Sequence, residues 1–124
     1  MTKTWYSAHI VVRVVFKDGN QDHCPVMENI VVLAAGSADE ALEKAESLGF
    51  AYEGDSGGSF TWDDRPAEWR FVGVRKIIEV RNAESNNSNI SDNTEVTYLT
   101  FELTDVATLQ RFMSGEPVML EIVD

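Results

Sequence analysis

The feature that most constrains the fold is a run of alternating residues near the N-terminus, TWYSAHIVVRVVFK at positions 4–17. Every second side chain is apolar, and most of these are β-branched or aromatic. Successive side chains of a β-strand point to opposite faces, so this period of two predicts a long strand with one buried face. The predicted buried face consists of Tyr6, Ala8, Ile10, Val12, Val14 and Phe16.

Five further runs have the composition of strands and are bounded by turn residues. The turn-forming run DGNQDHCP follows the first strand, and DDRPA separates the third predicted strand from the fourth. Gly73, inside the fourth, predicts a bulge or a close backbone approach. The five predicted strands cover residues 27–35, 59–62, 68–81, 94–103 and 118–123.

Two segments have the signals of helices. Ser37 and Glu40 form a capping box, and small or apolar residues then recur at helical spacing over 38–48, with Gly49 as the expected stop. Asp105 is the expected cap of a second helix over 106–114, which Gly115 ends.

The resulting order is β-β-α-β-β-β-α-β, without repeats or an interdomain linker. Together with a length of 124 residues, it predicts one α+β domain over residues 1–124. We expect an antiparallel sheet of about five to six strands with both helices on one face. The polar stretch 83–93 is expected to be a mobile hairpin loop.

The net charge of −11 limits the classes of partner. Residues 37–68 carry nine acidic and two basic side chains, whereas residues 70–81 carry four basic and one acidic. A field of this sign repels phosphate, which argues against nucleic acid as a partner. No apolar run is long enough to span a membrane, so no membrane association is expected. The single cysteine, Cys24, cannot form an internal disulfide, and we expect a cytoplasmic protein.

Residues 54–58 read GDSGG, the string around the nucleophilic serine of chymotrypsin-like proteases. A serine nucleophile needs an oriented base and an oxyanion hole, which those enzymes assemble from two β-barrels. This chain is too short for two barrels, and a predicted helix separates His23 from Ser56. Glycine, aspartate and serine are also ordinary residues of tight loops. We therefore interpret Ser56 as a loop residue and expect no catalytic residue.

No cofactor or metal site is expected either. His23 and Cys24 offer two zinc ligands but lack a convincing third. An acidic patch that could attract a cation has no EF-hand spacing, and a solvated face is the simpler interpretation. The patch consists of Glu53, Asp55, Asp63, Asp64 and Glu68.

Two functional hypotheses follow. The first is a small non-catalytic interaction module, with a regulatory or immunity-type role, that binds a basic protein through Asp39, Glu43, Glu46, Asp63 and Asp64. A homodimer is also expected, because Val11 and Val15 lie on the nominally polar face of the first strand.

The alternative is a small-ligand-binding protein or an unrecognised enzyme, with a pocket formed by His9, Trp62, Trp69 and Arg70. Trp62 and Trp69 are expected to contact each other across the hairpin.

Several stretches together resemble a known bacterial family, domain of unknown function 4288. They are WYSAH at 5–9, ENIVVLAAGSADEALEKAE at 28–46, EWRFVGV at 68–74 and NTEV at 93–96. Members open with Trp-Tyr, continue from a strand into a Ser-x-x-Glu-Ala helix and then show a Trp-(Arg/Glu)-Phe-x-Gly motif. The resemblance covers most of residues 5–100 and implies a compact α+β domain without a known activity. Residues from 101 onward are expected to form an extension.

Overall fold

Strand β1 (Thr4–Phe16) lies in the middle of a four-stranded antiparallel sheet with the order β2-β1-β4-β3. The computed structural model describes residues 3–82 and 89–123, so six of the residues expected to form a mobile loop, 83–88, lie outside the described part. Ala8 of β1 pairs with Val31 on one side and with Ile77 on the other. The other strands of this sheet are β2 (Val26–Ala35), β3 (Thr61–Trp62) and β4 (Arg65–Glu79).

The remaining elements follow in the predicted order, which confirms both the α+β class and the sequence of strands and helices. Strands β5 (Phe101–Glu102) and β6 (Glu121–Ile122) form a separate two-stranded ladder. The two helices are α1 (Ala38–Ala51) and α2 (Val106–Met113). Neither described helix is long and apolar enough to cross a membrane.

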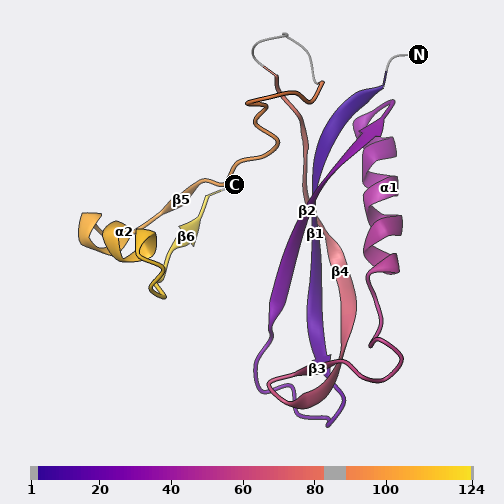
Figure 1. Ribbon diagram of the computed structural model, residues 1–124, viewed down its shortest axis with the longest axis vertical. Coiled ribbons are helices and arrows are strands. Elements are labelled where there is room, and N and C mark those ends of the chain that lie inside the picture. Colours follow the sequence, from indigo (N-terminus) through magenta and orange to yellow (C-terminus); the bar gives the residue numbers. More distant parts are fainter. Residues whose placement is uncertain (1–2, 83–88, 124) are drawn as a thin grey trace.

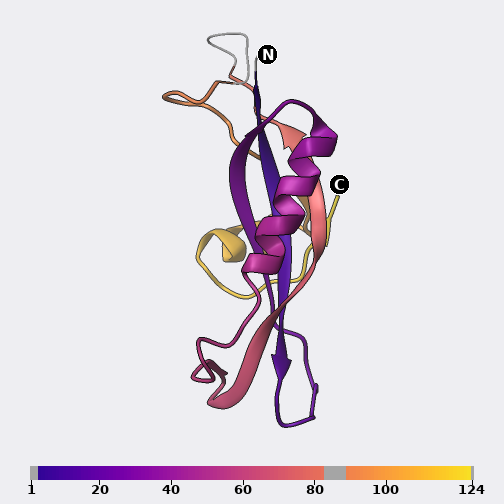
Figure 2. The same ribbon diagram turned by 90° about the vertical axis from the view of Figure 1, so that its right-hand side faces the viewer.

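Helix α1 packs against the face of the sheet that the alternation predicted to be buried (Figures 1 and 2). Ala8 and Ile10 of β1 and Ala45 of α1 are completely buried at this seam. Alanine lets helix and sheet approach closely, and the buried residues of α1 are the small ones, Ala41, Ala45 and Gly49. Leu42, in contrast, keeps 38% of its surface exposed and does not fill the seam.

The predicted end of α1 at Gly49 is wrong, because the helix continues to Ala51. Gly49 is buried within the helix and lies against the ring of Phe71, which leaves no room for a β-carbon. Glycine is therefore required for close packing at this position and not for a left-handed stop. The predicted capping box is confirmed at the other end. The Ser37 hydroxyl accepts from the Glu40 amide, and the Glu40 carboxylate accepts from the Gly36 amide at 2.8 Å.

The β3–β4 hairpin turns over two residues, and the prediction that DDRPA forms the turn is too long. Asp63 and Asp64 both have positive φ, 52° and 61°, and β4 begins directly afterwards at Arg65. Two consecutive left-handed residues give the tight turn whose twist matches a hairpin. Trp62 and Trp69 contact each other edge to face with ring centroids 5.9 Å apart, which confirms the expected pair.

Gly73 lies between two register irregularities of β4, which confirms the expected bulge. Along β1 the pairing passes from His9↔Lys76 to Ile10↔Val74, and then from Val11↔Gly73 to Val12↔Phe71. One residue of β4 is skipped at each step, and such extra residues bend a strand.

The C-terminal quarter of the chain departs most from the prediction. Residues 94–99 form no strand beyond an isolated bridge between Glu95 and Arg81. They cross the sheet face opposite α1, and we call them the crossing segment. Residues 100–123, with β5, α2 and β6, form what we call the C-terminal arm. The arm lies on the side of the sheet opposite α1 (Figure 1), so the expectation that both helices cover one face is wrong. The predicted strands 94–103 and 118–123 shorten to two residues each.

Candidate functional site

The sheet face opposite α1, which we call the outer face, buries two polar side chains of β1 beneath the crossing segment. Ser7 and His9 are each 0% exposed. The Ser7 hydroxyl donates to the carbonyl of Val96, and His9 Nε2 lies 2.6 Å from Thr97 Oγ1. Because buried polar groups need partners, these contacts fix the crossing segment on the sheet.

His9 is the centre of a longer polar network. Its Nδ1 donates to Glu28 Oε2 at 2.6 Å, and the guanidinium of Arg75 contacts both oxygens of the same carboxylate at 2.8 Å. The hydrogen bond from Arg75, followed by that from His9, holds the pKa of Glu28 below its ordinary value of 4.5. The carboxylate is therefore ionised at neutral pH and orients the His9 ring.

The hydroxyl of Thr97, the imidazole of His9 and the carboxylate of Glu28 are connected in the same order as the three groups of a serine-hydrolase catalytic triad. A catalytic base must exchange protons with a substrate, however, and the ring of His9 has no exposed surface. Glu28 binds Nδ1 of this ring and Thr97 binds Nε2, so both ring nitrogens already have a partner within the protein. The arrangement is suited to a clamp that satisfies buried groups.

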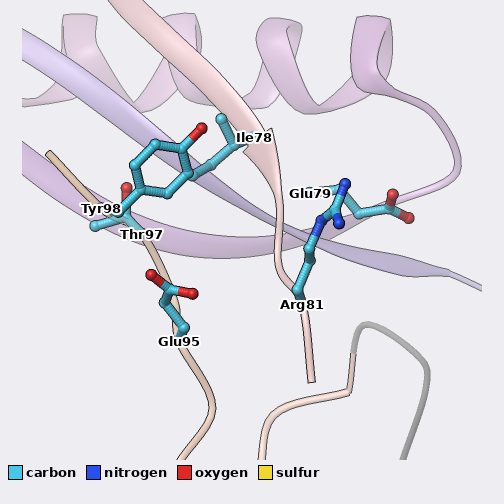
Figure 3. Close-up of a pocket in the computed structure, with 6 residues that line it drawn as sticks. All are labelled: Ile78, Glu79, Arg81, Glu95, Thr97 and Tyr98. Atoms are coloured by element: carbon cyan, nitrogen blue, oxygen red, sulfur yellow. The ribbon is translucent and has the colours of Figure 1, made fainter. Parts of the chain in front are cut away.

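A pocket of about 230 Å³ lies between the end of β4 and the crossing segment (Figure 3). Thr97 is on its wall, so the pocket adjoins the His9 network. Its volume is below the range usual for drug-sized ligands. The lining residues are Ile78, Glu79, Arg81, Glu95, Thr97 and Tyr98.

The four residues proposed for a ligand pocket do not line one pocket. Trp69 pairs with Val14 on the face that carries α1, whereas Arg70, its neighbour in the strand, pairs with Arg13 on the outer face with His9. Alternation along β4 therefore separates them. Trp62 and Trp69 pack in a second apolar cluster around three buried residues, Val14, Phe16 and Ala67.

The residues of the protease-like string lie in a loop. Ser56 has a positive φ of 55°, and its carbonyl accepts from the Ser59 hydroxyl at 2.8 Å. Within the described part of the chain, neither histidine contacts Ser56: His9 contacts Glu28 and Thr97, and His23 contacts Asp22. Cys24 is exposed and not part of a disulfide.

The acidic residues proposed as a partner surface fall into two groups. Asp39, Glu43 and Glu46 are exposed on α1 at positions i, i+4 and i+7, so they form one stripe along the helix. Asp63 and Asp64 form the β3–β4 turn, where His23 Nε2 lies 3.4 Å from Asp63. In the residues that the structure describes, no three His, Cys, Asp or Glu side chains are arranged to hold a metal ion.

Other members of the expected acidic patch have partners in the protein. The carboxylate of Glu53 accepts from the Phe71 amide at 2.9 Å, and Asp55 contacts Lys17. The hydrogen bond from Lys17 lowers the pKa of Asp55 below its usual value. These acids therefore tie the loop after α1 to the sheet.

Sequence reasoning missed a charged cluster around Arg65. Its guanidinium contacts the carboxylates of Asp18 at 2.8 Å and Asp22 at 2.9 Å, and it lies over the ring of Phe16 at 3.7 Å. The Arg65 hydrogen bond, followed by that from His23, lowers the pKa of Asp22 to about 2. The cluster joins the β1–β2 loop to the β3–β4 turn. The only sequence signal for this cluster is the pair of acidic residues, Asp18 and Asp22, in the turn-forming run after the first strand.

The arm is unusual because its apolar side chains are exposed. Helix α2 has no buried residue, and none of the residues 101–123 is fully buried. Inside the arm, Phe101 contacts Phe112 edge to face at 5.3 Å. Neither apolar core cluster includes a residue of the arm. The most exposed of its apolar side chains are Val106, Met113, Met119 and Ile122, between 55% and 87% exposed.

These features define a class of small α+β protein, in which one helix covers one face of a four-stranded antiparallel sheet and a crossing segment covers part of the other. A family model described as "Domain of unknown function (DUF4288)" matches residues 5–96. The chain therefore belongs to this family, which confirms the resemblance found in its sequence. No curated protein and no solved structure matches the chain. The matched region ends within the crossing segment, so the arm lies outside it.

Proposed function

We propose that this chain is a small, non-catalytic protein-interaction module of the bacterial cytoplasm, with a regulatory or immunity-type role. The observation that carries the proposal is the arm. It presents a row of exposed apolar side chains from a short segment that contains no core. Contiguous exposed apolar surface of this kind marks protein-binding sites, because leaving it in water is unfavourable.

The acidic stripe of α1 supports the same function and indicates the charge of a partner. Asp39 lies in the first turn, where a negative charge also favours the helix dipole. Glu43 and Glu46 have no such role, and no basic residue lies in the last turn. We infer a basic protein partner, whose association rate falls as salt screens the attraction.

The alternative, a small-ligand site or an unrecognised enzyme, would use the pocket beside Thr97. Its support is the polar network behind that pocket. The complete burial of His9 favours the interaction module, because the ring cannot contact a ligand in that pocket.

The test is affinity capture of partners from cytoplasm at low and high salt. The full-length chain is compared with the variant Glu43→Lys/Glu46→Lys. A matched control, Glu79→Lys/Asp92→Lys, makes the same change of net charge at exposed positions outside α1. We expect basic proteins that bind the wild-type chain and the control but are lost with the α1 variant. Acidic partners, or equal capture by all three chains, would contradict the proposal for α1.

A further inference from the structure

In the proposed function the arm is a protein-binding segment, and the structure also indicates the protein to which it binds. We propose that the arm of one chain docks on the outer face of a second copy of the same chain, and that the second copy returns the contact with its own arm. This inference rests on the proposed function only for the general role of the arm. The choice of a second copy as the partner is argued from the two surfaces, their charges and their positions.

The first surface is one side of α2. Val106, Leu109, Phe112 and Met113 recur at helical spacing, so they share a face. Their exposed fractions are between 37% and 74%. A helix of eight residues is too short to be stable in water without tertiary packing, so this face needs a surface to cover it.

The second surface is the part of the outer face that the crossing segment leaves open. Val11 and Val15 of β1 point to this face, since they alternate with the buried Ile10 and Val14. On β2, every second residue points the same way, and the large apolar ones are Val26, Ile30 and Val32, between 41% and 58% exposed. Apolar side chains thus remain on this face on both sides of Glu28, which lies between Val26 and Ile30 and binds Arg75.

The outer face and the β5–β6 ladder of the arm each also carry a pair of like charges directly opposite one another. Arg13 of β1 pairs in register with Arg70 of β4 on the outer face. Glu102 of β5 pairs in register with Glu121 of β6 in the arm. Like charges directly opposite in a sheet are destabilising. Arg70 contacts Glu68, whereas Arg13 has no ion pair among the described residues.

The two pairs have opposite sign, so each can neutralise the other. The arginine pair shares the outer face with apolar side chains. Glu102 and Glu121 alternate with Phe101 and Ile122, so they lie on the side of the β5–β6 ladder opposite the Phe101 ring that contacts α2. The arm as a whole carries four acidic side chains over residues 101–123 and one basic, Arg111. Docking of α2 would cover both apolar surfaces, and the net negative charge of the arm would favour its approach to Arg13 and Arg70.

A second copy fits better than the arm's own sheet. The crossing segment is fixed by Ser7 and His9, and the arm beyond it extends away from its own sheet (Figure 1). Exchange of an identical segment between two chains reproduces the same contact twice and closes the assembly as a symmetric dimer. The contact is then reciprocal and leaves no arm uncovered.

The test uses the purified full-length chain and two charge-reversed variants, studied by sedimentation at high micromolar concentration. The wild-type protein should sediment at twice the chain mass of 13.9 kDa. Glu102→Arg/Glu121→Arg reverses the arm, and Arg13→Glu/Arg70→Glu reverses the outer face. Each variant alone should be monomeric, because its arm and its outer face then repel. A 1:1 mixture should regain the dimer mass, because each arm now meets a face of opposite charge.

A wild-type chain that remains monomeric overturns the inference, and so do reversed variants that dimerise like the wild type. A mixture that stays monomeric, with both variants folded by circular dichroism, also overturns it and indicates that the arm folds onto its own sheet. If a reversal prevents folding, Leu109→Arg replaces it, with Gln110→Arg on the same helix as the matched control. Only Leu109→Arg should lose the dimer. These measurements need no other protein, so their failure is distinct from failed capture of a basic partner.

Discussion

Substitution of Gly49 by alanine tests the helix–sheet seam most directly. A β-carbon at this position would lie 2.9 Å from Cζ of the Phe71 ring and closer still to Cε1 and Cδ1. Real β-carbons essentially never approach so closely, so the ring or the helix must move. The ring cannot shift freely, because it packs edge to face on Phe50 with centroids 4.8 Å apart.

Two opposing effects set the magnitude. Alanine is favoured over glycine inside a helix by about 0.5–1 kcal/mol. Overpacking of a well-packed seam costs about 1–3 kcal/mol. The second effect is larger, so we expect Gly49→Ala to lower the free energy of unfolding by about 1–2 kcal/mol, which is a fall in Tm of roughly 3–8 °C for a chain of this length.

The assay is urea denaturation followed by circular dichroism, with two comparisons. Ser47→Ala, at an exposed position of α1, should be neutral or slightly stabilising. In the double variant Gly49→Ala/Phe71→Leu, the alanine should cost less than it does alone, because the smaller side chain makes room. A Gly49→Ala protein more stable than the wild type would refute the reasoning, since the helix would then dock elsewhere.

Three further predictions concern single residues. Leu42→Ala should lower stability by less than about 1 kcal/mol, because the side chain is already 38% exposed; a loss above 2 kcal/mol in urea denaturation would place Leu42 in the seam. Glu28→Gln should cost about 1–3 kcal/mol at pH 7, since it leaves His9 and Arg75 poorly paired. The folded pKa of Glu28 is lowered, so its stabilisation is present above the ordinary value of 4.5 and is lost as pH falls through the lower folded value. Unfolding curves of wild type and variant should therefore converge in acid, and a constant difference down to pH 2 would contradict the role given to the charge. Ser56 should not react with a fluorophosphonate, and Ser56→Ala should change stability by less than about 0.5 kcal/mol; stoichiometric labelling detected by mass spectrometry would show a nucleophile.

Local patterns predicted the elements whose determinants are close together in sequence. Alternation identified the buried face of β1, and the capping residues placed the starts of both helices, at Ser37 and Asp105. The end of α1 was missed because Gly49 has the chemistry of a stop. Its actual constraint is a ring 22 positions later, which no local pattern contains.

The polar network was missed for the same physical reason. Period-two alternation places His9 on the face opposite the core. Its burial depends on Thr97, 88 residues later, in a segment predicted to be a strand. The prediction of a strand over 94–103 is based on β-branched residues, but Val96 and Thr97 instead lie in an irregular segment that contacts Ser7 and His9. Period-two patterning indicates which side chains share a face of the strand, but not which distant segment of the chain buries that face.

The long separation between the crossing segment and its contacts has a consequence for how the chain folds. Ser7 and Val96 are 89 residues apart, and closing so large a loop is slow because its entropy is lost before the contact forms. We therefore expect the hairpin of β1 and β2 to form first, with Ser7 and His9 still hydrated. Polar side chains at these positions reduce the apolar surface that this intermediate presents, and a larger apolar surface would favour aggregation during the delay. The same two residues that later lie buried thus protect the chain until the crossing segment arrives.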